Sequence, residues 1–166
     1  MKEWITGRNP VMEVLQAKRR QVFRLLLASG VEEKGRVTEM LRIASDRKIL
    51  VERVPRDRID RLGENPQGVA AEVSAYPYVD LSDIIEQAAS THEDLFVLVL
   101  DLIQNPQNLG TLLRTAEAAG LHGVVIPQHR AAEVTPAVVS ASAGASEHLL
   151  IAQGNITRSL DQLKQH

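Results

Sequence analysis

The 166-residue sequence contains no cysteine, and this absence removes several classes of protein from consideration. Without thiols the chain can form no disulfide bond, no cysteine-based zinc site and no thiol-dependent active site. The five histidines show no metal-ligand spacing with acidic residues, so we expect no metal site. A Gly-x-Gly-x-x-Gly pattern and a P-loop are also missing, which disfavours the nucleotide-dependent enzymes that carry those motifs.

Long apolar runs are absent as well. The start, Met1–Thr6, lacks the apolar core of a signal peptide, and no later stretch approaches the roughly 20 apolar residues of a membrane span. We therefore expect a soluble, cytoplasmic protein with no membrane partner. With 44% hydrophobic and 24% charged residues, the chain has enough apolar side chains to bury a core.

Positive charge is distributed unevenly along the chain. Residues 1–75 hold 15 Lys and Arg against 11 Asp and Glu, whereas residues 76–166 hold 4 against 10. The first segment is therefore the better candidate for contact with a polyanion. The same excess is also typical of solvated helix faces, so charge alone leaves both interpretations open.

Apolar periodicity predicts helices and strands in alternation, which indicates an α/β fold. We expect a helix from Asn9–Pro10 onward, further helices over 32–47, 56–62, 81–89, 109–119, 135–144 and 155–164, and strands over 22–28, 49–54, 68–73, 95–100, 124–126 and 148–152. The continuous apolar run Leu95–Leu100 is typical of a strand covered on both faces of a parallel sheet. The irregular segment around Pro77 predicts a boundary, with domains over 1–75 and 95–166 joined by a linker and helix at 76–94.

The segment Leu100–Ala116 is predicted to run from a buried strand through a polar loop into a helix. In open parallel sheets, ligands gather at the carboxyl ends of the strands. Asn108 is placed to cap the helix, Gly110 leaves room for a ligand backbone, and free amides of the first turn attract anions. Arg114 lies one turn beyond Gly110 on the same face and can reach such an anion. A second interpretation stays open, in which Asn108 is only a cap and Arg114 pairs with Glu117 at the surface.

Residues Asn105–Gly120 follow the pattern Asn-Pro-x-Asn-Leu-Gly-x-x-x-Arg-Thr-Ala-x-x-x-Gly, which resembles the first signature of the SpoU (TrmH) family of RNA 2′-O-ribose methyltransferases. Three further blocks agree with the family in order: Gly7–Val11 with Glu13 and Leu15, Gln67–Ala70, and Ser142–Ala145 with Glu147. The resemblance spans essentially the whole chain. Within the family, the chain most resembles the subgroup that includes the guanosine 2′-O-methyltransferases of large-subunit (23S) ribosomal RNA.

This resemblance implies a small L30e-like α/β domain that binds the RNA substrate, followed by the first half of a SPOUT (α/β knot) parallel-sheet domain. It also implies S-adenosylmethionine as methyl donor, ribosomal RNA as substrate, and a homodimer in the full-length form. Asn108 and Arg114 would belong to the catalytic corner. Because a guanidinium stays protonated in proteins, we assign Arg114 to the RNA phosphate and the developing oxyanion, and not to a general base.

Candidate RNA contacts follow from the same resemblance and from basic residues. They are Arg8 and Asn9 at the first helix start, Gln67 and Gly68 in a loop, Gly110, and the basic cluster of Lys18, Arg19 and Arg20. Asn9 also fits a simple helix cap and the basic cluster also fits a charged helix end, so both alternatives stay open. With only five aromatic residues, backbone and shape contacts are expected in place of a stacking platform.

Two features depart from the family pattern. Pro66 stands where a histidine is expected before Gln67, so the chain lacks any role of that histidine. The second and third signatures of the family, which hold the methyl donor and most of the dimer interface, do not occur before the last residue, His166. We therefore expect this chain to lack the donor-binding half and to be inactive alone. Two other functions stay open: a non-catalytic RNA-binding module, and a degenerate subunit that completes its fold with a partner chain.

Overall fold

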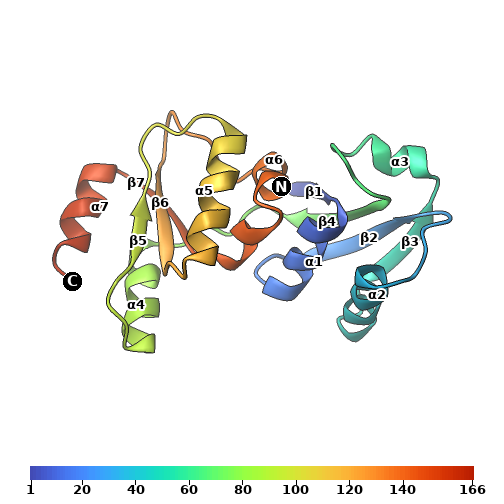
Figure 1. The fold of residues 1–166 in the computed structure, drawn as a ribbon, viewed down its shortest axis with the longest axis horizontal. Helices are drawn as coiled ribbons and strands as arrows, with labels where there is room; N and C mark the ends of the chain where they lie inside the picture. The colour runs from blue at the N-terminus through green and yellow to red at the C-terminus, as the bar shows by residue number, and fades with distance from the viewer. The chain divides into compact units, whose positions relative to one another are not determined.

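The chain folds around two separate β-sheets in the computed structural model, which describes residues 1–166 (Figure 1). Each sheet belongs to its own unit, Met1–Tyr76 and Pro77–His166. The division falls in the irregular segment around Pro77, where proline and its neighbours support neither a helix nor a strand period. The α/β fold class predicted from the sequence is confirmed.

The first unit is built on a four-stranded mixed sheet. Its strands are β1 (Lys2–Thr6), β2 (Val22–Ala28), β3 (Leu50–Val54) and β4 (Val69–Ser74), and its helices are α1 (Arg8–Ala17), α2 (Arg36–Asp46) and α3 (Arg56–Asp60). The strand order is β1-β4-β2-β3, with β2 and β3 parallel and the other pairs antiparallel. The sequence pattern does not predict β1, because this short strand is completed only by distant β4 residues such as Glu72, which lies opposite Trp4.

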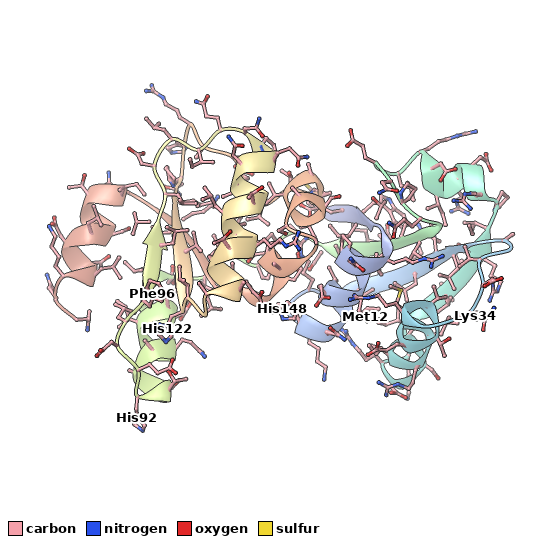
Figure 2. The ribbon with its side chains drawn as sticks, viewed as in Figure 1. Met12, Lys34, His92, Phe96, His122 and His148 are labelled. Carbon is pink, nitrogen blue, oxygen red and sulfur yellow. The ribbon has the colours of Figure 1, made fainter.

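Both faces of this sheet are covered by other parts of the unit. Successive strand residues point to opposite faces, yet Leu25, Leu26 and Leu27 of β2 are all at most 1% exposed. Helices α1 and α2 pack against each other, and α1 also contacts β1 and β4. Met12, labelled in Figure 2, belongs to the buried side of α1. The short helix α3 contributes to a second core cluster, made of Leu26, Ala28, Val54, Ile59 and Ala70.

Arg20 lies inside the first unit and not at its surface. Its side chain is 0% exposed, and its Nη1 atom lies 2.7 Å from Glu3 Oε2. The same nitrogen donates a hydrogen bond to the Ser74 carbonyl oxygen at 3.1 Å, and the guanidinium lies 5.0 Å from the centre of the Tyr76 ring. A buried charge needs such partners, because desolvation of an unpaired ion costs on the order of several kcal/mol. Arg20 therefore joins β1 to the end of β4.

The second unit is built on a three-stranded parallel sheet. Strands β5 (Val97–Val99), β6 (Gly123–Pro127) and β7 (Ile151–Gly154) lie in the order β5-β6-β7. The helices are α4 (Leu81–Thr91), α5 (Pro106–Ala118), α6 (Pro136–Ala141) and α7 (Ile156–Leu163), with a 3-10 turn, η1, at Ala145–His148. No helix of the chain has the length and apolar character that crossing a membrane requires.

Strand β5 lies at the edge of this sheet, and the partial exposure of its residues corrects the expectation that its apolar run is covered on both faces. Residues Val97–Val99 are only half-buried, and Phe96 is 53% exposed. The fully buried strand is β6, whose Val124–Ile126 are at most 2% exposed. His122 holds the start of β5 beside β6, since its Nδ1 atom accepts a hydrogen bond from the Phe96 backbone N–H at 3.1 Å (Figure 2). An apolar run cannot distinguish an edge from a central strand, because the number of neighbouring strands is a tertiary property.

Helix α5 packs very closely on α6 at Gly110. A Cβ atom built on Gly110 would lie 2.4 Å from Ala141 Cβ and 2.9 Å from the Ser142 backbone nitrogen. Both distances are far below van der Waals contact, so only a residue without a side chain fits here. The buried side of α5 continues through Leu109, Leu113 and Ala116. Gly110 therefore gives room to α6, which corrects the expectation that it makes room for a ligand backbone.

We predict that Gly110→Ala destabilises the second unit. Alanine is the better helix former by about 1 kcal/mol, but overpacking of the kind expected against Ala141 and the Ser142 backbone costs about 1–3 kcal/mol. The cost of overpacking should exceed the gain in helix propensity, because backbone atoms cannot move aside as the end of a flexible side chain can. The thermal unfolding midpoint measured by circular dichroism should therefore fall. Ala118→Gly, on the exposed side of the same helix, is the control for helix propensity alone. A midpoint that rises in Gly110→Ala would contradict the close contact of α5 with α6.

We also predict that Arg20→Met destabilises the first unit by about 2–4 kcal/mol, because it leaves the partly buried Glu3 carboxylate without its cation. The measurement is urea unfolding followed by circular dichroism and by the fluorescence of Trp4. Arg42→Met is the matched control, since Arg42 pairs with Asp46 at the surface and exposed pairs contribute little. Equal midpoints for the two variants would mean that the Arg20–Glu3 pair contributes no more than a surface pair.

Candidate functional site

Helix α5 begins with a side-chain cap at Asn105. The Asn105 side-chain oxygen accepts hydrogen bonds from the backbone N–H groups of Gln107 at 2.8 Å and Asn108 at 3.4 Å. Pro106 takes the first helical position, where a missing N–H costs nothing. The cap predicted at Asn108 is therefore wrong: it lies three residues earlier. The two amides already have an acceptor, so the expected anion cradle of free amides is not present there.

The cap at Asn105 leaves the Asn108 side chain available on the exposed side of α5. This side forms a polar stripe, made of Gln107, Asn108, Thr111, Arg114 and Thr115. The two threonine hydroxyls donate to helix carbonyl oxygens, at 2.9 Å and 3.1 Å. The Asn108 carboxamide and the Arg114 guanidinium have no partner within the chain, and the alternative pair of Arg114 with Glu117 does not form. Both groups are thus open to an external ligand.

A polar hollow of about 440 Å³ opens at the carboxyl ends of the strands of the second sheet. Its lining consists of Asp101 beyond β5, Pro127, Gln128 and His129 at the end of β6, and Gly154, Asn155, Ile156 and Thr157 where β7 leads into α7. This is the edge at which parallel sheets bind ligands. No residue of α5 lines the hollow, so Asn108 and Arg114 lie outside it. The sequence had predicted a single anion site that combined these helix residues with the carboxyl ends of the strands. No group of three or more His, Asp or Glu side chains is placed to hold a metal ion.

A second polar hollow, of about 450 Å³, lies in the first unit. We call it the α3 hollow; it is lined by Arg8, Arg56, Asp60, Asn65, Pro66 and Gln67. It brings together two predicted RNA contacts from distant parts of the chain, because the Arg8 backbone N–H donates to Gln67 Oε1 at 3.2 Å. Arg56 and Asn65 are not among the RNA contacts predicted from the sequence. The only signal is indirect: Asn65 stands in a turn-type segment, and Arg56 begins a short charged helix.

The predicted RNA contacts that neighbour Arg8 and Gln67 in the sequence, Asn9 and Gly68, do not line the α3 hollow. Asn9 is exposed in the first turn of α1, and it does not cap the helix because Gly7 stands at the cap position without a side-chain bond. Gly68 is buried, and a Cβ atom there would lie 2.5 Å from Val31 Cγ2. Gly68 therefore serves close packing of the loop, which corrects its assignment as an RNA contact.

The basic cluster of Lys18, Arg19 and Arg20 does not form one basic surface. Lys18 is exposed and ends α1 in the left-handed conformation, with φ of 56°. Arg19 is half-buried and donates to the Tyr76 hydroxyl at 3.1 Å. Arg20 is buried and paired with Glu3, so it cannot contact RNA, and its assignment to the RNA surface is wrong. The turn at Lys18 sends neighbouring side chains in different directions, which a sequence count of charges does not detect.

Each of the two units matches a known protein family. Residues 4–79 match the family described as "RNA 2′-O ribose methyltransferase substrate binding". Residues 95–166 match the SpoU rRNA methylase family. The crystal structure of the SpoU methyltransferase AviRb from Streptomyces viridochromogenes, in complex with AdoMet, is similar with a TM-score of 0.74 and 25% identity. The similarity covers 99% of this chain and 60% of AviRb.

Two curated relatives agree with these matches. YacO of Bacillus subtilis (strain 168), assigned to the TrmH family of tRNA/rRNA methyltransferases, is 37% identical over 98% of this chain and 66% of its own length. A protein of Staphylococcus aureus (strain COL) with the same assignment is 38% identical over 96% of this chain and 64% of its own length. The chain thus spans about two thirds of the length of these relatives. With both units matched to parts of one family and such relatives along nearly its whole length, this chain belongs to the SpoU (TrmH) family.

Proposed function

We propose that this chain is part of an RNA 2′-O-ribose methyltransferase that uses S-adenosylmethionine. The observation that carries the proposal is the pair of unpartnered side chains, Asn108 and Arg114, on the exposed stripe of α5 within the family signature. A guanidinium without an internal partner can make strong charge-assisted hydrogen bonds to an RNA phosphate. Following the resemblance within the family, we propose guanosine of ribosomal RNA as the target and a homodimer as the full-length assembly.

The roles of the two residues follow from the chemistry of a ribose hydroxyl. A hydroxyl is a poor nucleophile at neutral pH, so the reaction needs a fixed acceptor and stabilisation of the negative charge that develops on oxygen. Arg114 stays protonated, which suits it to hold an RNA phosphate and to neutralise that oxygen. Asn108 carries both a donor and an acceptor, so it can orient the ribose hydroxyls. The methyl group itself is supplied by S-adenosylmethionine when that donor is bound.

The hollow beyond β5, β6 and β7 does not by itself offer a complete site for the methyl donor. Small-molecule pockets bury most of their ligand against apolar and aromatic side chains, whereas the hollow beyond β5, β6 and β7 has only Pro127 and Ile156 of that kind. The Asp101 carboxylate could face the sulfonium cation of S-adenosylmethionine, but the lining has too few apolar side chains to enclose the adenine ring of that donor. We therefore propose that residues 1–166 alone do not hold S-adenosylmethionine and are inactive.

Arg114→Ala in the full-length enzyme should lower methyl transfer by at least about 100-fold, because one charge-stabilising group at the reacting oxygen is lost. The assay is transfer of labelled methyl groups from S-adenosylmethionine to ribosomal RNA, with donor affinity measured in parallel and expected to stay unchanged. Arg158→Ala is the matched control, since Arg158 is another exposed arginine on a helix of the second unit. Normal turnover in Arg114→Ala would refute this role for Arg114, whereas absence of methyl transfer by the unsubstituted enzyme as well would favour a non-catalytic RNA-binding module.

Titration of the 166-residue chain with S-adenosylmethionine in a calorimeter should give no heat beyond dilution, because the apolar part of a donor site is missing. Saturable binding near one molecule per chain would overturn this proposal and indicate that the hollow beyond β5, β6 and β7 is sufficient. In that case Asp101→Asn would weaken the binding, since it removes the only carboxylate of the lining.

A further inference from the structure

The α3 hollow has an excess of positive charge with weak internal partners. Two arginines and one carboxylate, Asp60, line it. Arg8 makes no ion pair, and Arg56 Nε lies 4.0 Å from Asp60 Oδ2, at the limit of an ion pair. The side chains of Arg56 and Asp60 are 66% and 49% exposed. An exposed pair of this kind is held weakly, so a stronger anion can replace Asp60.

Arg8 adds an observation that itself indicates a missing acceptor. Its Nε atom is shielded from solvent and has no hydrogen-bond partner. Buried polar groups in folded proteins are nearly always satisfied, so such a donor requires an explanation. Arg8 as a whole is half-buried and lines the α3 hollow, so a small rotation of its guanidinium toward an anion bound there would give this donor an acceptor.

The loop that forms one wall of the α3 hollow is held in place before any ligand arrives. The Thr6 hydroxyl donates to the Glu64 carbonyl oxygen at 3.4 Å, and the Val69 backbone N–H donates to the Pro66 carbonyl oxygen at 3.0 Å. The Arg8 backbone N–H is bound by the Gln67 side chain at 3.2 Å. A wall fixed at three points pays little ordering entropy when it binds a ligand. The loop therefore presents Asn65 and Gln67 in a defined position.

We propose that the α3 hollow binds a phosphate of a single RNA strand, with Arg8 and Arg56 on the phosphate and the amides of Asn65 and Gln67 on the adjoining sugar or base. This inference rests on the proposed function, and it adds Arg56 and Asn65 as residues that position the substrate. The lining has no aromatic side chain on which a free nucleotide base could stack. A phosphate that arrives as part of a strand does not need such a platform, because neighbouring phosphates contribute to binding.

The test is RNA binding by the 166-residue chain, measured by fluorescence anisotropy with a fluorescein-labelled single-stranded RNA of mixed sequence. Arg56→Gln should weaken binding roughly five- to tenfold and lower the slope of log affinity against log salt by about 0.7, the value for one phosphate contact on a single strand. Arg42→Gln is the matched control, because Arg42 also makes an exposed pair with the carboxylate four residues on, Asp46. It should change neither quantity.

A second variant, Asp60→Asn, is expected to change the RNA affinity in the opposite direction. If Asp60 competes with the phosphate for Arg56, its removal should tighten RNA binding about two- to fivefold. If Asp60 instead only supports α3, its removal should leave binding unchanged or weaken it, and either result would overturn the proposal. Arg56 and Asp60 both lie at the surface, so circular dichroism should show both variants folded.

Further outcomes separate this inference from the proposed function. If the chain binds the RNA and Arg56→Gln binds equally well, the α3 hollow is not the phosphate site, while the methyltransferase proposal is untouched. If the chain binds no RNA at any salt concentration, the RNA-binding role of the first unit fails as well. Competition with uridine monophosphate distinguishes a strand from a free nucleotide: displacement of the RNA at micromolar nucleotide would overturn the choice of a strand.

Discussion

The contact of α5 with α6 at Gly110 is the constraint on which the position of the polar stripe of α5 depends. Because the α5 backbone at Gly110 lies directly against Ala141 and the Ser142 backbone, with no room for a side chain on the α5 side, the rotation of α5 about its axis is fixed. A shift of one residue would turn the helix by about 100° and would bring Leu109 or Leu113 to water. The same constraint keeps Asn108 and Arg114 exposed. The Asn105 cap then fixes the end of the helix from which a ligand would approach.

Two of the four blocks that resemble the family, Gln67–Ala70 and Asn105–Gly120, divide their residues in the same way. In each block a glycine is buried against a neighbouring element: Gly110 against α6, and Gly68 against Val31. Residues close to that glycine carry groups without a full set of internal partners: Arg114 in the block of Gly110, and Arg8, which belongs to the Gly7–Val11 block but is bonded to Gln67 beside Gly68. A glycine in these blocks therefore holds the backbone in place, and the polar side chains around it are left for a ligand. Assigning every residue of a block to ligand contact is what made the Gly68 and Gly110 predictions wrong.

Local patterns predicted most elements of the fold, and tertiary contacts explain the rest. Strand β2 was expected over residues 22–28 and occupies Val22–Ala28, because its apolar run is bounded by residues that do not fit a strand. Helix α2 begins at Arg36 and not at residue 32, because Gly35 has a φ of 56° that a helix does not tolerate. The missed strand β1 and the edge position of β5 both depend on which strand lies alongside, and no local period contains that information.

Family membership could be predicted from sequence because the signature is long and ordered, and it is confirmed. The roles of individual residues could be predicted only in part. The burial of Arg20 depends on Glu3 and Ser74, which are distant in sequence, and the α3 hollow depends on a loop folding back onto the start of α1. The assignment of Asn108 and Arg114 to catalysis stays a prediction, since their exposure is compatible with it but does not require it.

The charge of the first unit shows why net charge alone is a poor guide to a polyanion site. Most of its cations already have carboxylate partners: Lys2 and Arg24 with Glu72, Arg36 with Glu13, Arg53 with Glu33, and Arg61 with Asp57. What matters for an RNA phosphate is the free energy needed to release a cation from its present partner. For the Arg20–Glu3 pair this release would leave a buried guanidinium and a partly buried carboxylate unpaired, which costs on the order of several kcal/mol. For the exposed Arg56–Asp60 pair the loss is at most about 1 kcal/mol, and Arg8 has no acidic partner to lose. The α3 hollow therefore brings together two cations that an RNA phosphate could bind without breaking a buried ion pair, which is the property that the net charge of the unit does not report.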